Sequence, residues 1–406
     1  MRIANCRVLD VREGSLLEGR TIVIRDGIIE RISRGGGAAH GEAETIEAEG
    51  RVVIPGLMNL HTHPQRRHAG LSGGMVPFRI GAAAVEDLPN TQRIVWAIRN
   101  TWFEMLEHGV TTFRAAGSKD CLNIELRDVF RKGVLGGPRV IASGAILATT
   151  GGHGTRGING AMEVDGPDEM RKAVRALLKA GADWIKLCVS GGLAGIHKGD
   201  HPTIVEFSDE EIRTAVVEAH RRSRKVMVHG MASQSVRMAV EAGVDCIEHG
   251  NLLDDATVSL MKSHGVSFVP TMSGIRMVYE REKVGGDPAV AAALWEVISP
   301  HSEAVKKCIE AGVLIGTGTD TLGNVHDEIR MLASCGMTPA RAIAAATRDS
   351  ARVLGLENEI GAVEEGMKAD LVVVDGDPTH DLECLSKIKE VIVGGRVADR
   401  EFLTAR

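Results

Sequence analysis

Aromatic residues are scarce in this sequence. Phe, Trp and Tyr together account for 3% of the 406 residues, and Tyr279 is the single tyrosine. Stacked aromatic rings are the usual platforms for single-stranded nucleic acids, so their scarcity argues against such a site and also against a carbohydrate cleft. An excess of basic residues is missing too, because the formal net charge at pH 7 is −6. We therefore expect no nucleic-acid partner.

Paired cysteines and long apolar runs are also missing. The seven cysteines are scattered, odd in number and without a CxxC pair, which suits reduced thiols in a core. Residues 1–6 lack a hydrophobic signal region, and no apolar run approaches the length that spans a membrane. These features predict a cytoplasmic protein without a membrane partner.

The middle of the chain contains a regular alternation of short apolar segments with helical patterns. Helix signals include the capping-box spacing of Ser208 and Glu211, and glycines such as Gly181 at positions that suit left-handed helix caps. The apolar segments, which we expect to be strands, are 53–61, 109–116, 139–146, 183–190, 225–229, 245–249, 266–272 and 313–319. Eight strands alternating with helices predict an α/β fold, a parallel (β/α)8 TIM barrel with functional groups at the strand carboxyl ends.

The two ends of the chain have a different pattern. Residues 21–25 alternate apolar and polar side chains and lead into Asp26-Gly27, a hairpin signal. Residues 369–376 and 391–395, near the other end of the chain, have a similar pattern of a strand-like segment followed by turn residues. We therefore expect a small β-sandwich domain formed by both chain termini, residues 1–55 and 357–406, beside a barrel of residues 56–356.

Two histidines end the first apolar segment of the predicted barrel. In an extended strand, side chains two residues apart share a face, so His61 and His63 of LNLHTH can bind one cation as neutral imidazoles. A lone HxH pair is weak evidence, because such pairs also occur on solvated edges. Here the preceding VVIPGLMNL is apolar, and burying two unpaired histidines would be costly. Metal ligation would offset that cost.

Lys186 lies within the apolar segment WIKLCV, where its ammonium group needs compensation. It could extend its charge to solvent, pair with a buried carboxylate, or act as a Schiff-base lysine in an aldolase. It could also react with carbon dioxide to give a carbamate whose two oxygens bridge two cations. We favour the carbamate because histidines and an aspartate are predicted nearby.

Three further candidate ligands end other apolar segments: His229 in VMVHG, His249 in CIEHG and Asp320 in GTGTD. In a parallel barrel the carboxyl ends of the strands meet at one face. With His61, His63 and Lys186, these residues therefore predict one metal site and a metal-dependent hydrolase.

The ordered set of motifs resembles the amidohydrolase superfamily over essentially the whole chain. PGLMNLHTH, the strand lysine, VHG, IEHG and GTD carry this resemblance, and KADLVVVDGDP near the end is similar to part of the superfamily's β-sandwich. Residues 143–154, SGAILATTGGHG, resemble one branch in particular. This branch holds metal-dependent Xaa-Pro dipeptidases (prolidases), Arg/Lys carboxypeptidases and ochratoxin amidase-like enzymes, and it sits beside imidazolonepropionase.

The resemblance implies a binuclear site of two divalent metal ions, with zinc as the default. In that site His61, His63 and Asp320 hold one cation and His229 and His249 hold the other, while carboxylated Lys186 and a hydroxide bridge them. Two neighbouring cations lower the pKa of the shared water and polarise the scissile carbonyl. Asp320 could then move the proton from the attacking hydroxide to the leaving nitrogen.

His153 is the best candidate for a catalytic residue that is not a ligand. It lies in the glycine-rich segment TTGGHG, which could approach a substrate closely. The ring could then hydrogen-bond the oxyanion of the tetrahedral intermediate. The alternative is an ordinary surface histidine. Of the other histidines, His197 and His201 could belong to a lid over the site, although such residues are more often solvated.

Recognition of a substrate carboxylate has less support. Relatives often place an aromatic or polar residue two positions after the histidine that corresponds to His229, whereas this chain has Met231, which cannot donate a hydrogen bond. A carboxylate would need other groups, and the candidates are Arg66, Arg67, Arg156 and Arg276.

Several functions stay open at this point. The leading one is hydrolysis of a linear amide, a dipeptide (Xaa-Pro or similar) or an N-acyl amino acid. The alternative is hydrolysis of a cyclic amide or imidazolone, a urea or a carbamate at the same site. A mononuclear deaminase ranks lower, because that branch generally replaces the strand lysine. A non-catalytic scaffold also ranks lower, because all six predicted ligands are present. The expected partner is a small-molecule amide, and a homo-oligomer is left open.

Overall fold

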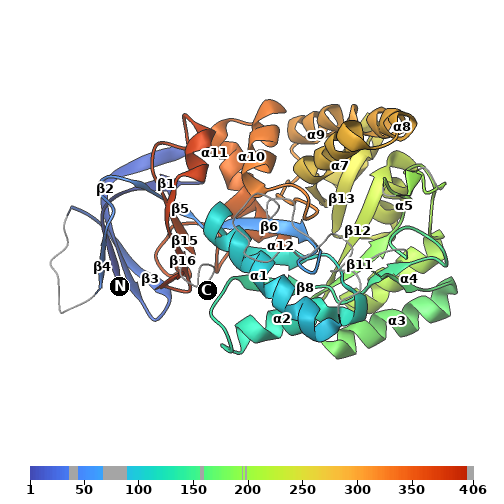
Figure 1. Cartoon of the computed structure of the whole chain (residues 1–406), viewed down its shortest axis with the longest axis horizontal. Coiled ribbons are helices and arrows are strands. Elements are labelled where there is room, and N and C mark those ends of the chain that lie inside the picture. Colours follow the sequence, from blue (N-terminus) through green and yellow to red (C-terminus); the bar gives the residue numbers. More distant parts are fainter. Residues whose placement is uncertain (36–43, 67–88, 156–159, 194, 197–198, 400–406) are drawn as a thin grey trace.

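The structure, a computed structural model, describes residues 1–35, 44–66, 89–155, 160–193, 195–196 and 199–399. Its strands lie in three sheets, and helices flank the two parallel ones (Figure 1). The helices are α1 (Asn90–His108), α2 (Leu122–Arg131), α3 (Gly166–Ala180), α4 (Asp209–His220), α5 (Ser233–Ala242), α6 (Asp255–Ser263), α7 (Met272–Gly285), α8 (Pro288–Ile298), α9 (His301–Glu310), α10 (Val325–Ser334), α11 (Pro339–Ala344) and α12 (Ser350–Leu354). Among the described residues, no helix has the length and apolar character needed to cross a membrane.

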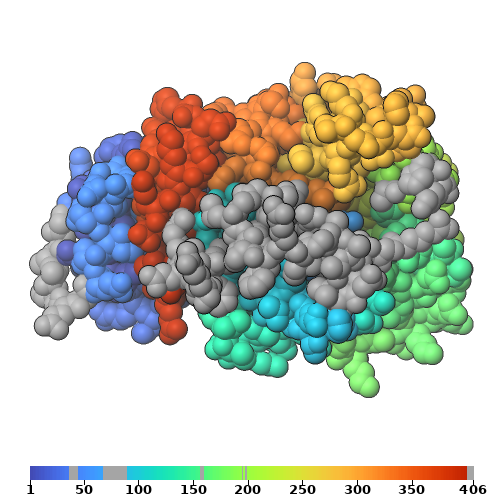
Figure 2. Space-filling model, viewed as in Figure 1, coloured from blue at the N-terminus to red at the C-terminus, as the bar shows by residue number. Residues whose placement is uncertain are grey.

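The first sheet joins the two ends of the chain. Its eight strands are β1 (Arg2–Asp10), β2 (Ser15–Arg25), β3 (Ile28–Arg34), β4 (Thr45–Glu47), β5 (Val52–Pro55), β15 (Leu371–Val374), β16 (Ile388–Val393) and β17 (Arg396–Val397). The link is the antiparallel pair β5 and β15, in which Val53 faces Val373. The blue amino-terminal and red carboxy-terminal segments accordingly lie side by side at one end of the molecule (Figure 2).

The other two sheets are parallel. One contains β6 (Leu57–Thr62), β7 (Val110–Ala115) and β8 (Arg139–Ala142). The other, in the order β10-β9-β11-β12-β13-β14, contains β9 (Ile146–Ala148), β10 (Met162–Glu163), β11 (Trp184–Cys188), β12 (Lys225–Ala232), β13 (Cys246–Leu252) and β14 (Ser267–Val269). Parallel strands alternating with helices confirm the α/β class predicted from the sequence.

Residues 313–319, the last predicted barrel strand, are irregular. On one side, Ile315 forms an isolated bridge with Phe268 of β14. On the other side, the Leu60 amide donates to the Thr317 carbonyl at 2.7 Å, and the Thr319 amide donates to the His61 carbonyl at 3.0 Å. Among the described residues, the parallel strands therefore form two sheets joined through this segment. They do not form one continuous eight-stranded ladder.

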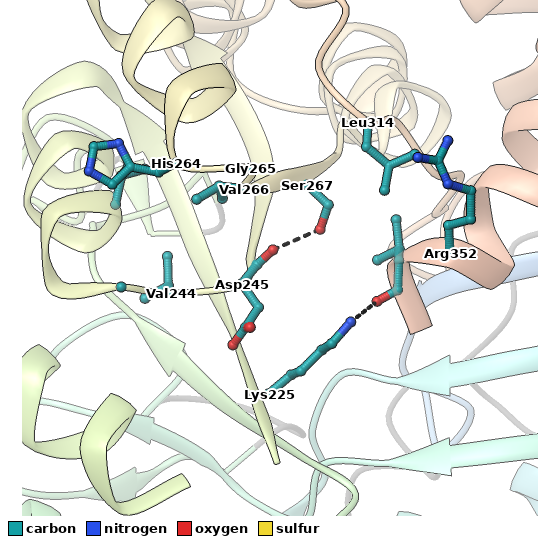
Figure 3. Close-up of a pocket in the computed structure, with 12 residues that line it drawn as sticks. Lys225, Val244, Asp245, His264, Gly265, Val266, Ser267, Leu314 and Arg352 are labelled. Atoms are coloured by element: carbon teal, nitrogen blue, oxygen red, sulfur yellow. Dashed lines mark hydrogen bonds between the residues drawn. The ribbon is translucent and has the colours of Figure 1, made fainter. Parts of the chain in front are cut away.

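A pocket opens at the amino-terminal ends of three strands (Figure 3). Lys225, Asp245 and Ser267, at or just before the first residues of β12, β13 and β14, line it together with Arg352. Two of its charged groups are already engaged with backbone. Lys225 donates to the Val353 carbonyl at 2.9 Å, and Asp245 accepts from the Val226 amide at 2.7 Å.

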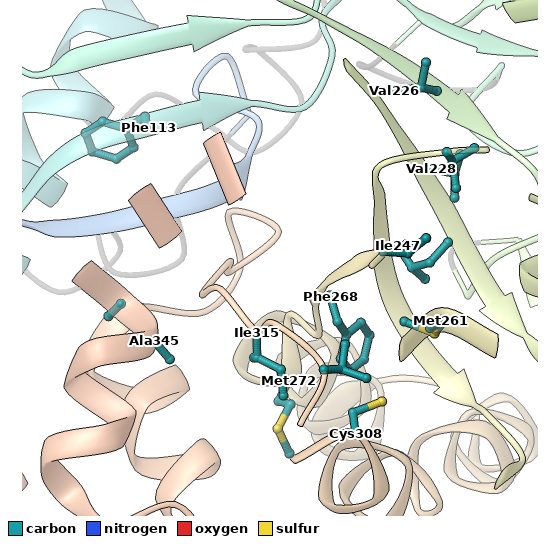
Figure 4. Close-up of a cluster of buried hydrophobic side chains, with 14 of the residues drawn as sticks. Phe113, Val226, Val228, Ile247, Met261, Phe268, Met272, Cys308, Ile315 and Ala345 are labelled. Carbon is teal, nitrogen blue, oxygen red and sulfur yellow. The ribbon is translucent and has the colours of Figure 1, made fainter. Parts of the chain in front are cut away.

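Apolar side chains between the parallel strands and the helices form the largest core. Phe268 of β14, Met261 of α6, Cys308 of α9 and Ile247 of β13 belong to this one cluster (Figure 4). Burying large apolar side chains is the main source of stability. The terminal sheet has a second cluster, which includes Ile22 and other residues from both chain ends. The largest core also includes Val52, Ile54, Val372 and Val374 of the terminal sheet, so this sheet contributes side chains to both clusters.

Gly56 connects the two sheet systems, since β5 ends at Pro55 and β6 begins at Leu57. Its amide donates to the Asp370 carbonyl at 2.8 Å. A Cβ at this position would lie 2.0 Å from the Oγ1 atom of Thr111, a stiff β-branched side chain in β7. The junction therefore requires the absence of a side chain.

We expect Gly56→Ala to lower the free energy of unfolding by about 1–3 kcal/mol, because the added methyl group overpacks the junction. Gly136→Ala is the matched control: a Cβ there meets nothing within 4 Å, so the change should stay within about 0.5 kcal/mol. Urea unfolding followed by circular dichroism measures both. Equal stability of the two variants would contradict the tight junction.

Candidate metal centre

The structure brings all six predicted ligands to the carboxyl-terminal side of the parallel strands. His61 lies in β6 with His63 just after it, Lys186 lies in β11, His229 in β12 and His249 in β13, and Asp320 follows the 313–319 segment. Five of them are buried, and the Asp320 side chain is 18% exposed. This end is opposite the pocket of Figure 3. Functional groups gather at this end in parallel α/β folds because the loops that follow the strands meet there.

His61, His63 and Asp320 form the tightest group. The Nε2 atoms of His61 and His63 lie 3.5 and 3.4 Å from Asp320 Oδ1. One ligand atom from each residue lies within 4.8 Å of the others. Two imidazoles and a carboxylate at this spacing suit a divalent cation such as zinc. The two-residue spacing of the histidines thus places both rings on one side, as predicted.

The outer nitrogens of these two rings face protein groups, and that of His63 is hydrogen-bonded. His61 Nδ1 lies 3.0 Å from Glu248 Oε2, and His63 Nδ1 lies 2.9 Å from the Gly117 carbonyl. A ring nitrogen that donates outward leaves its lone pair on the other nitrogen. Such outer partners are the usual means of orienting metal-binding histidines.

His249 and His229 are oriented in the same way. His249 Nδ1 lies 2.8 Å from the Thr271 hydroxyl, which itself donates to the Pro270 carbonyl and therefore accepts from the ring. His229 Nε2 lies 3.2 Å from the Gly191 carbonyl. The two ring centroids are 4.4 Å apart. These contacts leave Nε2 of His249 and Nδ1 of His229 without an outer partner in the described contacts.

The four imidazoles are neutral at ordinary pH. Burial lowers the pKa of His61 to about 4 and that of His63 to about 3, and it lowers the pKa of His229 and His249 well below the usual value. A neutral imidazole is the form that binds a metal. The electrostatics of the site therefore match the predicted role of these residues.

Asp320 is ionised. Burial alone would raise its pKa, but the adjacent His61 ring and the charge of Arg66 hold the pKa well below its usual range. Arg66 Nη1 donates to Asp320 Oδ1 at 3.3 Å. This arginine, a candidate clamp for a substrate carboxylate, is thus already bound to a predicted ligand.

Lys186 meets a carboxylate that the sequence reasoning did not select. Its Nζ atom contacts Glu248 Oε2, and Arg114 Nη2 donates to Glu248 Oε1 at 3.1 Å. The side chains of Arg114 and Glu248 are fully buried. Burial lowers the pKa of Lys186 to about 7. The cluster is a buried network of two cationic groups around one carboxylate.

A signal for Glu248 and Arg114 was present in the sequence. Each is a charged residue inside an apolar strand segment, in CIEHG and VTTFRA, as Lys186 is in its own strand. Buried charges need partners, so the same cost argument that selected Lys186 could have selected all three. Their mutual contact could not be read from the sequence, because it depends on strand packing.

The structure also places His153 at the site. Its ring stacks on that of His229 with centroids 4.3 Å apart and an interplanar angle of 26°. His153 Nδ1 lies 2.7 Å from Asp200 Oδ2, a partner that sequence reasoning missed. His201 instead contacts Thr203 on its own loop. His197 lies outside the described residues.

The remaining arginine candidates are not brought to the site. Arg276 of α7 pairs with Glu280 at 2.7 Å and lies over the Trp295 ring. Arg67 and Arg156 lie outside the described residues.

Comparisons with known proteins agree with this geometry. The model of the amidohydrolase family matches residues 52–398. Ochratoxinase from Aspergillus niger is 29% identical over 407 residues, covering 93% of this chain and 82% of the relative.

Solved structures extend the likeness to the whole chain. A crystal structure of an amidohydrolase is 34% identical, with a TM-score of 0.85 over 98% of both chains. A prolidase in complex with N-methylphosphonate-L-proline is 30% identical, with a TM-score of 0.86 over 98% of this chain and 99% of that one. These relatives confirm the branch that the sequence motifs indicated. The chain therefore belongs to the amidohydrolase family and is a hydrolytic enzyme acting on carbon–nitrogen bonds.

Proposed function

We propose that this enzyme cleaves the amide bond of a dipeptide, Xaa-Pro or similar, or of an N-acyl amino acid, with two divalent metal ions. The observation that carries the proposal is the convergence of four neutral, inward-oriented imidazoles on one buried site that also holds an ionised aspartate. The likeness to a prolidase and to ochratoxinase supports a linear amide as the substrate.

The residues present fit two cations, with zinc as the default. His63, His229 and His249 each have one ring nitrogen bonded to an outer group and the other available, which is how metal ligands are prepared. The first cation would be held by His61, His63 and Asp320, the second by His229 and His249, and both by Lys186 in its carboxylated form. When bound, such cations lower the pKa of a coordinated water and polarise a carbonyl.

Carboxylation of Lys186 accounts for a lysine at this position. The reaction joins the neutral amine to carbon dioxide with loss of one proton, and it gives an anionic group with two ligand oxygens. Because burial lowers the Lys186 pKa to about 7, a neutral amine is accessible near neutral pH. The product would give up the contact with Glu248, which keeps its hydrogen bond from Arg114 at 3.1 Å.

Asp320 and His153 would handle the proton and the developing charge. Asp320 would take a proton from the attacking water and pass it to the leaving nitrogen, since an amide anion is a very poor leaving group. His153 would bond the substrate oxyanion through Nε2, because its Nδ1 faces Asp200. That bond requires a proton on Nε2, so the ring that makes it carries both protons, with Asp200 as the counter-charge.

We also infer that residues 56–356 close into a (β/α)8 barrel and that residues 1–55 and 357–406 form a composite β-sandwich. Hydrogen bonds from the 313–319 segment to both parallel sheets support the closure. The second apolar cluster, to which strands from both termini contribute, supports the second domain. Three points remain predictions: a cytoplasmic location, a possible homo-oligomer, and a small-molecule substrate as the partner.

A second substrate class has its own support. Arg66 is engaged with Asp320, and Met231, two residues after His229, is fully buried and cannot donate a hydrogen bond. Neither residue is thus a free clamp for a substrate carboxylate. A cyclic amide or imidazolone, a urea or a carbamate, which needs no such clamp, is therefore the alternative.

The substrate class can be tested by amine release from a library of dipeptides and N-acyl amino acids, including Xaa-Pro and Xaa-Arg/Lys members. We expect the zinc-loaded enzyme to release amine from one class of carboxy-terminal residue. Asp320→Asn is the blank and should be at least about 100-fold slower, because it lacks the proton-transfer group. No release with two cations bound would contradict the linear-amide proposal and favour cyclic amides, ureas and carbamates.

The role of Lys186 can be tested by metal content. We expect Lys186→Ala to lose the second cation and most activity, with partial rescue by a short carboxylic acid in solution, because the added carboxylate can replace the bridging group. Lys179→Ala, on the exposed side of α3, is the control and should keep two cations per chain. Full activity with two bound cations in Lys186→Ala would refute the carbamate.

A further inference from the structure

The His153–Asp200 pair joins two segments that each follow a different strand. His153 lies on the segment after β9, and Asp200 lies on the segment after β11. Strand β11 itself carries Lys186. The distance from His153 Nδ1 to Asp200 Oδ2 is 2.7 Å, and the side chains are 18% and 25% exposed. A charge-assisted hydrogen bond of this length between partly buried groups fixes the orientation of the ring.

Asp200 is itself held in place. Its Oδ1 atom accepts from the Gly192 amide at 2.7 Å, and its own amide donates to the Gly195 carbonyl at 3.1 Å. The same segment also holds the histidine backbone, because Glu206 Oε1 accepts from the His153 amide at 3.2 Å. Two carboxylates from the segment after β11 therefore anchor one residue of the neighbouring loop.

Gly192 provides the surface on which the ring lies. A Cβ there would be 2.1 Å from Cε1 and 2.5 Å from Nδ1 of His153, so the ring packs directly against the glycine backbone. The ring of His229 stacks close by, with its centroid 4.3 Å away. Packing and the carboxylate together leave Nε2 as the ring atom available to a substrate.

We propose that Asp200 is a positioning residue for His153: with the ring packed against Gly192, it holds the Nδ1–H bond and so presents Nε2 to the substrate carbonyl. The proposal rests on the proposed amide hydrolysis for its kinetic consequence, while the ring orientation stands on geometry alone. Asp200 acts through His153 and does not touch the reacting atoms, as an orienting carboxylate does beside a catalytic histidine.

A double-mutant cycle tests whether Asp200 acts through His153. We expect Asp200→Ala to lower kcat by about tenfold to a hundredfold with little change in KM and with two cations retained, a range typical of lost orienting partners. In a His153→Ala background, Asp200→Ala should have no further effect. Equal losses in both backgrounds, or loss of a cation, would overturn the positioning role.

Two further variants separate orientation from general damage. Gly192→Ala leaves every charge in place but displaces the ring, so it should lower kcat to a similar extent. The matched control is Asp377→Ala, because Asp377 forms a 3.2 Å pair with His380 on the exposed surface, and it should leave kcat unchanged. Wild-type kcat in Gly192→Ala would count against the proposal.

Nitrogen-15 NMR of histidine-labelled, zinc-loaded enzyme gives a readout that needs no substrate. In the wild type, His153 should carry a proton on Nδ1 that exchanges slowly with solvent, and Asp200→Ala should abolish that protection. An unchanged His153 signal in the variant would overturn the proposal. If no amide is hydrolysed, the proposed function fails, while the spectra still decide the role of Asp200.

Discussion

The buried carboxylate of Glu248 balances the charges at the centre of the site while Lys186 is unmodified. It contacts Lys186, accepts from Arg114 Nη2 at 3.1 Å and lies 3.0 Å from the outer nitrogen of His61. Without it, two cationic groups would face each other in an interior where an unpaired charge is very costly. Because Glu248 directly precedes His249 in β13, one strand carries both the carboxylate of the charged cluster and a proposed ligand. The charged cluster and the proposed metal site therefore share one strand.

Around this centre the fold contributes orientation more than reactivity. The strands bring the rings together, and the segments beyond the strand ends supply the groups that fix each ring, such as Thr271 for His249 and Asp200 for His153. Burial keeps the imidazoles neutral, with the pKa of His63 lowered to about 3. Rings oriented in this way would need little rearrangement to receive a cation.

The sequence located most strands because its signals are local, but the segments predicted as single strands at 53–61 and 139–146 are each divided between two sheets, as β5 and β6 and as β8 and β9. Apolar segments located strands, and cap residues located helices. The spacing of His61 and His63 placed both rings on one side, where they meet Asp320. The eighth segment was harder: residues 313–319 form only an isolated bridge at Ile315, and no local pattern predicted the left-handed φ of 45° and 69° at Asp320 and Thr321 that follow. The contact between Glu248 and its cationic partners joins strands far apart in the sequence, so only the packing reveals it.

The central claim, that one buried site holds two cations, is tested most directly by anomalous diffraction at the zinc edge from crystals grown with zinc and bicarbonate. The predicted result is two peaks per chain, one beside His61 and Asp320 and one beside His229 and His249, with carbamate density on Lys186 between them. A single peak, or two peaks with an unmodified Lys186 still in contact with its carboxylate partner, would contradict the bridged binuclear site.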